Sequence, residues 1–145
     1  MSLFEFIKKS PKAELHLHIE GTLEPDQMFV LAKKNNIQIP FKSIDDVKRA
    51  YNFDNLDSFL KIYYEGTKVL VNEQDFFDLT WAYALKCKEE NIVHTEIFFD
   101  PQTHIERGVK FDVVINGIYN ALLKAEKQFG LSFKIIMCFL RHLDE

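Results

Sequence analysis

The segment PKAELHLHIEG, residues 11–21, alternates apolar and polar side chains as a β-strand does. Leu15, Leu17 and Ile19 fall on one face of such a strand. The opposite face carries Glu14, His16, His18 and Glu20. We expect a strand over residues 13–19. An ordinary half-buried strand places Lys, Thr or Ser on its polar face as readily as His, so two imidazoles on one face indicate a chemical function.

The composition is that of a globular protein with enough apolar bulk for a core. Of the 145 residues, 47% are hydrophobic and 28% are charged, and 14 are Phe. The formal net charge is −4, and the Lys and Arg residues are scattered rather than gathered in a stripe. This pattern argues against nucleic acid or an anionic membrane surface as a partner. No apolar run reaches the roughly 18 residues that a membrane span needs.

The cysteine pattern bears on the compartment. Cys87 and Cys138 lie far apart, and there is no C-x-x-C pair, so we expect two buried thiols in a reducing environment. The first ten residues, MSLFEFIKKS, contain no long apolar segment and no small-residue cleavage site. Together these features predict a cytoplasmic protein.

Beyond the first strand, the hydrophobic periodicity switches between helical and extended patterns. A helix is expected to begin at Pro25, and a second is expected to be capped by Ser43. Asn55 or Asp54 is expected to cap a helix that extends to residue 70, and Asn72 precedes a long helix over residues 73–91. A further helix is expected over residues 114–129. Two further strands are expected over residues 94–100 and 133–140, and the second is apolar on both faces, as in a covered parallel strand. The resulting order of strand, several helices, strand, helix, strand predicts an α/β fold with a parallel sheet and right-handed crossovers.

The connection between the first two strands is about twice the usual minimum length, and its surplus is helical. Insertions after the carboxyl end of a strand are where α/β barrels carry lids and substrate walls. We therefore predict the first three strands of a TIM-type (β/α)8 barrel with a helical insertion after the first strand. A full barrel takes about 250 residues. Residues 1–145 are accordingly expected to form the N-terminal portion of a single (β/α)8 domain.

The barrel interpretation has two consequences. It places the polar rows of the first two strands, including Glu14 and Glu96, in the interior. It also leaves an open apolar edge, which predicts either a longer parent protein or self-association through that edge. A smaller open sheet is the remaining alternative.

The histidine pair itself suggests a metal. His16 and His18 stand at positions i and i+2, with Cα atoms about 6.5–7 Å apart, so both rings can turn toward one ion. Zinc held by nitrogen and oxygen ligands with an open position activates water near neutral pH. The spacing alone leaves a second interpretation equally open, namely two histidines that are hydrogen bonded in a polar interior.

Longer segments of the chain narrow this choice. The segments are PKAELHLHIEGTLEP, FLKIYYEGTKVL, NEQDFFDLTWAY, HTEIFFDPQTHIERGV and IIMCFLRHL. In these segments the chain resembles the adenosine and adenine deaminase family, whose members are zinc aminohydrolases built on a (β/α)8 barrel. Within the family it is most similar to the adenine deaminases, because Glu20 stands where adenosine deaminases usually have Asp. The longer side chain would take up space that a ribose requires.

The resemblance implies roles for a few residues. His16 and His18 are the implied zinc ligands, and His18 and Glu20 are the implied substrate-binding residues. The implied reaction is hydrolytic deamination of a purine, with adenine giving hypoxanthine and ammonia. Adenosine is the alternative substrate, and a catalytically incomplete interaction protein is the alternative function. The catalytic Glu and the remaining ligands are expected beyond residue 145, so residues 1–145 alone are expected to be inactive.

Other polar and aromatic residues are expected to have structural roles. Asp100 is expected to start a turn rather than to line a pocket, and His104 to lie at the surface or cap a helix. An aromatic stripe at helical spacing is more often core than a purine-stacking wall. His94 and His142 are expected to be structural, and Arg141 to pair with Glu96. The stripe consists of Phe59, Tyr63 and Tyr64.

Overall fold

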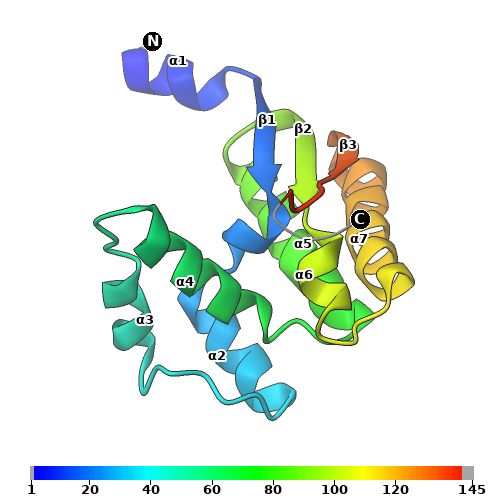
Figure 1. The fold of residues 1–145 in the computed structure, drawn as a ribbon. Helices are drawn as coiled ribbons and strands as arrows, with labels where there is room; N and C mark the ends of the chain where they lie inside the picture. The colour runs from blue at the N-terminus through cyan, green and yellow to red at the C-terminus, as the bar shows by residue number, and fades with distance from the viewer. Residues whose placement is uncertain (1, 142–145) are drawn as a thin grey trace.

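The computed structural model describes residues 2–141, and its centre is a three-stranded parallel sheet in the order β1-β2-β3 (Figure 1). Strand β1 spans Lys12–His18, β2 spans Ile92–Phe99 and β3 spans Ser132–Met137. The predicted α/β class is confirmed, and the sheet has the form of the first three strands of a TIM-type barrel. The first strand begins and ends one residue earlier than predicted, and the third ends before Cys138.

Four helices fill the connection from β1 to β2, which confirms the helical insertion. They are α2 (Pro25–Lys34), α3 (Ile44–Ala50), α4 (Leu56–Thr67) and α5 (Glu73–Glu89), preceded by a short 3-10 helix η1 (Ile19–Thr22). Helices α3, α4 and α5 begin where the predicted capping residues are, because each capping side chain accepts the N–H three residues on. These caps are Ser43, Asn55 and Asn72.

The second crossover contains α6 (Pro101–Ile105) and the long helix α7 (Phe111–Phe129). Helix α7 ends at Gly130, which has a φ of 75° and therefore adopts the left-handed conformation that glycine tolerates. Neither α6 nor the N-terminal helix α1 (Leu3–Lys9) follows from the periodicity of the sequence. In Figure 1, α1 lies at the amino end of β1, whereas α2, α3 and α4 gather beyond its carboxyl end.

The core lies between the sheet and the helices α5 and α7. Ile97 and Phe99 of β2 are fully buried there together with Phe76 of α5 and Ile118 of α7. Helices α5 and α7 approach closely at Gly117, where an added Cβ would lie only 2.5 Å from the carbonyl oxygen of Glu73. The alternate residues of β2, His94, Glu96 and Phe98, lie on the opposite face of the sheet and are only partly buried.

A β-bulge in β1 reverses the expected orientation of Glu14. Glu14 pairs with Thr95 and Leu17 pairs with Ile97, so β1 contains one residue more than β2 in this interval. Glu14 therefore faces the helices, where its carboxylate accepts a hydrogen bond of 2.7 Å from the hydroxyl of Tyr83. The prediction that Glu14 shares the inner face with the histidines is wrong, because the extra residue changes the alternation.

Within residues 2–141, β1 and β3 are the edges of the sheet. Met137 and Phe139 are 42% and 71% exposed, so the predicted burial of both faces of the third strand is not found in the described chain. Leu15 and Val93 are also exposed. Self-association through this edge stays a prediction. Among the described helices, none combines the length and the apolar character that crossing a membrane requires.

Candidate active site

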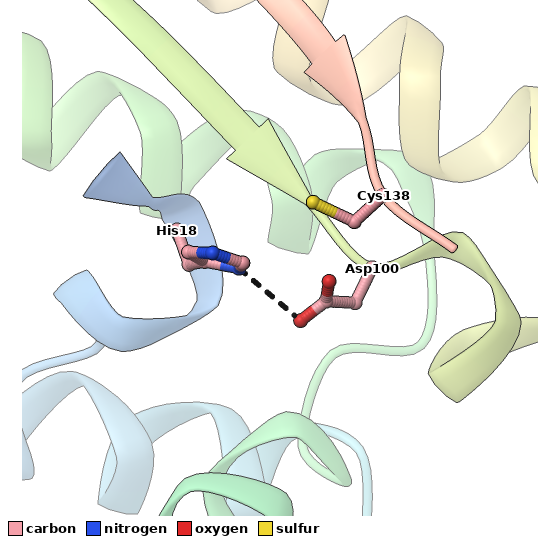
Figure 2. A group of neighbouring side chains, drawn as sticks. All are labelled: His18, Asp100 and Cys138. Atoms are coloured by element: carbon pink, nitrogen blue, oxygen red, sulfur yellow. Dashed lines mark ion pairs between the residues drawn. The ribbon is translucent and has the colours of Figure 1, made fainter. Parts of the chain in front are cut away.

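The carboxyl ends of the three strands converge on one point. His18 ends β1, Asp100 follows β2 and Cys138 follows β3, and one ligating atom of each lies within 4.8 Å of the others (Figure 2). The backbone holds this convergence, because the N–H of Cys138 donates to the carbonyl of Phe99 at 3.0 Å. The carboxyl end of a parallel α/β sheet is where such folds place their sites.

A cavity of about 560 Å³ opens at this point, within the range usual for small-molecule sites. His16 and His18 line it from β1, Asp100 lines it from the position after β2, and Phe59, Tyr63 and Tyr64 line it from α4. The expectation that the aromatic stripe belongs to the core is therefore wrong. The helical insertion contributes a wall of the cavity, as the barrel interpretation predicts.

The two histidines lie side by side on the cavity wall. Their ring centroids are 5.7 Å apart and their planes are inclined by 27°. Phe98 of β2 stacks beside both rings, with centroid distances of 4.3 Å to His16 and 5.5 Å to His18. Packing on Phe98 limits the rotation of both rings, so the two imidazoles stay side by side at the carboxyl end of β1.

Asp100 turns its carboxylate toward the cavity. Its Oδ2 lies 2.7 Å from the hydroxyl of Tyr63 and 3.4 Å from Nδ1 of His18 (Figure 2). Burial, together with the nearby carboxylates of Glu20 and Asp100, raises the pKa of Tyr63 well above its usual range, so this hydroxyl is a donor. Asp100 also occupies the position before α6, but its side chain does not cap that helix. The residue belongs to the pocket as well as to the turn.

Glu20 lies in η1 beneath the cavity rather than on the strand. Its side chain is only 1% exposed, and it is not among the residues that line the cavity. The carboxylate accepts the backbone N–H of Asp100 at 2.9 Å and lies 3.1 Å from Nε2 of His104. The hydroxyl of Tyr63 is 3.3 Å from its second oxygen. The predicted contact of Glu20 with the substrate stays a prediction.

His104 is fully buried, so the expectation of a surface or capping residue is wrong. Its Nδ1 lies 2.7 Å from Nη2 of Arg107. A guanidinium can only donate, so Nδ1 accepts, and the proton of the ring is on Nε2, which donates to Glu20. Two sequence features agree with this arrangement: Pro101 occupies a first helical position, and His104 and Arg107 are three residues apart.

The remaining candidates lie away from this network. His94, at the amino end of β2, contacts the hydroxyl of Ser132 and lies 3.6 Å from Glu96, which fits a structural role. The predicted pair of Glu96 with Arg141 is not found among the described residues, and His142 lies outside them. Both cysteines are free thiols, and burial raises the pKa of Cys87 and of Cys138 to about 11.

The donor set at the strand ends fits a transition metal. Imidazole nitrogen, carboxylate oxygen and cysteine sulfur are the ligand types that zinc accepts. Within residues 2–141, neither ring nitrogen of His16 takes part in a hydrogen bond, so the one N–H and the one nitrogen lone pair of the neutral ring are both uncommitted. A structural histidine in a polar interior would instead be hydrogen bonded. His16 therefore has the free nitrogen that a metal ligand needs.

Comparisons with known proteins agree on one family. The family model described as adenosine deaminase matches residues 11–145. A curated adenine deaminase of Wolinella succinogenes is 64% identical over 144 residues, which are 99% of this chain and 44% of that protein. The crystal structure of adenine deaminase from Arthrobacter aurescens is 46% identical with a TM-score of 0.84, over 88% of this chain and 39% of that chain.

A more distant structure shares the fold. An amidohydrolase from Burkholderia ambifaria, crystallised with bound zinc, is 21% identical with a TM-score of 0.82, over 97% of this chain and 38% of that chain. In each comparison the chain spans less than half the length of the protein it matches.

Proposed function

The chain belongs to the adenosine deaminase family, and from this premise we propose that the complete protein is a zinc-dependent adenine deaminase. The proposed reaction adds water at C6 of adenine and breaks the bond from C6 to the amino nitrogen, which gives hypoxanthine and ammonia. Residues 1–145 would be the N-terminal portion of a single (β/α)8 domain. The adenine deaminases of Wolinella succinogenes and Arthrobacter aurescens, at 64% and 46% identity, support adenine over adenosine.

The observation that carries the proposal is the pair of imidazoles on the cavity wall. His16 and His18 are held by Phe98 at the carboxyl end of β1, and both line the cavity of about 560 Å³. We assign them as two ligands of the zinc ion. When bound, zinc supplies an activated water near neutral pH. The amidohydrolase of Burkholderia ambifaria, which contains zinc, supports this choice of metal through its shared fold.

The cavity wall suits a flat purine. Phe59 and Tyr64 of α4 line the cavity together with the histidines of β1. Aromatic rings bind a heterocycle by stacking and exclude water from its face. His18 is proposed to contact the substrate as well as the metal. A cytoplasmic location stays part of this proposal, and the two free thiols support it.

The test is a deaminase assay on the complete protein loaded with zinc. Release of ammonia from adenine and formation of hypoxanthine are expected, with adenosine assayed alongside at the same concentration. If the protein converts adenosine in preference to adenine, the assigned substrate becomes adenosine, within the same family. A folded, zinc-loaded protein that converts neither purine would refute the proposal.

A further inference from the structure

Asp100 lies between the proposed zinc ligand His18 and a buried chain of hydrogen bonds. We propose that Asp100 is a positioning residue that accepts the Nδ1 proton of His18 and so presents Nε2 of His18 to the metal. This inference rests on the proposed function, since it concerns the same zinc ion. It assigns to the residue after β2 a role in shaping a ligand of β1.

The imidazole of His18 and the carboxylate of Asp100 are in contact. Nδ1 of His18 lies 3.4 Å from Oδ2 of Asp100, and the side chains are 37% and 8% exposed (Figure 2). The ring of His18 lies within 21° of parallel to that of Phe98, so its plane is set by packing. An ionised carboxylate only accepts, so a ring proton on Nδ1 would point toward Asp100 and would leave the lone pair of Nε2 free for the metal.

A histidine that binds a metal through one ring nitrogen still has a proton on the other. A ligating imidazole usually donates its other N–H to a carboxylate or a carbonyl, which fixes the tautomer and the ring orientation. Coordination through Nε2 makes the Nδ1 proton more acidic, and a hydrogen bond to an anion is stronger than one to a neutral acceptor. Asp100 therefore supplies the partner that His18 requires when it binds zinc.

Tyr63 and Glu20 hold Asp100 in place. The hydroxyl of Tyr63 donates to the same Oδ2 at 2.7 Å, which fixes the rotamer of the carboxylate. The backbone N–H of Asp100 donates to Glu20 at 2.9 Å, which fixes the position of its Cα. One group acts on the side chain and the other on the main chain, so the carboxylate has little freedom to leave His18.

His104, supported by Arg107, holds Glu20 in place. His104 donates from Nε2 to Glu20, and Arg107 donates to Nδ1 of His104. The same guanidinium also donates to the carbonyls of Lys68 and Leu70, after the end of α4, at 3.3 Å each. A continuous set of contacts thus joins the segment after α4 to the proposed metal ligand of β1, and its central part, from His104 through Glu20 to the backbone of Asp100, is buried.

The experiment measures zinc affinity in the complete protein by competition with a chelating dye. Asp100→Asn and Asp100→Ala are expected to bind zinc about 10- to 100-fold more weakly than the wild type. Asp112→Asn, an exposed carboxylate in the first turn of α7, is the matched control and should bind zinc normally. Affinity within about twofold of the wild type in both Asp100 variants would overturn the proposal.

The tautomer of His18 can also be measured directly in the wild-type protein, without any variant. In the zinc-free wild type, ¹⁵N NMR of the His18 ring should show the Nδ1–H tautomer, and Asp100→Asn should shift it toward Nε2–H. The Nε2–H tautomer in the wild type would refute the role of Asp100. Absence of both zinc binding and adenine turnover in the wild type would instead refute the proposed function, and this inference with it.

Discussion

The carboxylate of Glu20 accepts the backbone N–H of Asp100 at 2.9 Å, so the residue two places after the histidines holds the residue that follows β2. Glu20 has the reach for this contact because its side chain is one methylene longer than that of Asp. The length of the carboxylate at this position therefore sets the place of Asp100 on the cavity wall. We propose that Glu20 acts on substrate choice through the position of Asp100.

Shortening Glu20 tests this relationship. Glu20→Asp withdraws the carboxylate from Asp100 and from His104, so Asp100 loses the contact that fixes its place on the cavity wall. We expect the ratio of kcat/KM for adenosine to that for adenine to rise by about tenfold. Steady-state assays of both substrates measure it. Glu14→Asp shortens a carboxylate on the opposite face of β1 and is the control; an unchanged ratio in both variants would contradict the prediction.

Replacing His104 tests the support beneath the site. His104→Phe keeps the ring volume but removes the donor to Glu20 and the acceptor for Arg107. The buried carboxylate of Glu20 then loses a donor and the exposed guanidinium of Arg107 loses one of its acceptors. We expect the free energy of unfolding to fall by about 1–3 kcal/mol. Urea unfolding of the complete protein measures this. His94→Phe, at the amino end of β2, should cost less than about 1 kcal/mol; an equal cost at both positions would count against the network.

Removing either histidine tests the metal assignment. His16→Ala or His18→Ala takes away one of the two imidazoles on the cavity wall. We expect loss of tightly bound zinc and a fall in adenine turnover of about 100-fold or more. Metal analysis after gel filtration and the deaminase assay measure the two effects. His94→Ala should retain both zinc and activity, and stoichiometric zinc in either of the first two variants would refute the ligand role.

The strand order and the histidine pair could be read from the sequence, since alternation and periodicity are local properties. The orientation of Glu14 could not, because it depends on a bulge defined by the pairing of β1 with β2. A local pattern has no information on where a partner strand gains or loses a residue. The same holds for the depth of a residue in a loop: His104 is fully buried, because α6 returns it beneath η1.

The aromatic residues of α4 illustrate a different limit. Their spacing fits a helix face, and the helix was predicted correctly, but periodicity does not say what that face contacts. In the structure the face of Phe59 and Tyr63 meets a cavity instead of a core. Asp100 behaves similarly, since Asp followed by Pro predicts the local turn and gives no sign of Tyr63 and His18 across the sheet.

Asp75 predicts a pH dependence of stability away from the site. Burial alone would raise its pKa, but hydrogen bonds from Lys34, Val71, Asn72 and Asn35 lower it below its ordinary value of 3.8. The contacts are between 2.7 and 3.1 Å long. Because the folded pKa is the lower one, the stabilisation is present above about pH 4 and is lost as the pH falls through the folded pKa.

Asp75→Asn measures this contribution. We expect the variant to be less stable than the wild type by about 1–3 kcal/mol at pH 7. The difference should shrink as the pH falls below about 4, since both proteins then lack the charge. Urea unfolding at a series of pH values, under conditions where the protein refolds, gives the curve. A difference that is constant from pH 7 to pH 3 would contradict the role of the ionised carboxylate.

The packing of α5 on α7 predicts the opposite of what helix propensity predicts at Gly117. Alanine favours a helix over glycine by about 1 kcal/mol. An added Cβ at this position, however, would lie 2.5 Å from the carbonyl oxygen of Glu73 and 2.6 Å from Cβ of Phe76. Both atoms belong to a neighbouring helix and cannot move alone. We therefore expect Gly117→Ala to lower the free energy of unfolding by about 1–3 kcal/mol.

Asn116→Ala is the control, because it changes the exposed neighbour on α7. This variant should gain a few tenths of a kcal/mol in stability from helix propensity alone. Urea midpoints with an unchanged slope report the comparison, and a Gly117→Ala protein as stable as Asn116→Ala would show that the two helices can separate without cost.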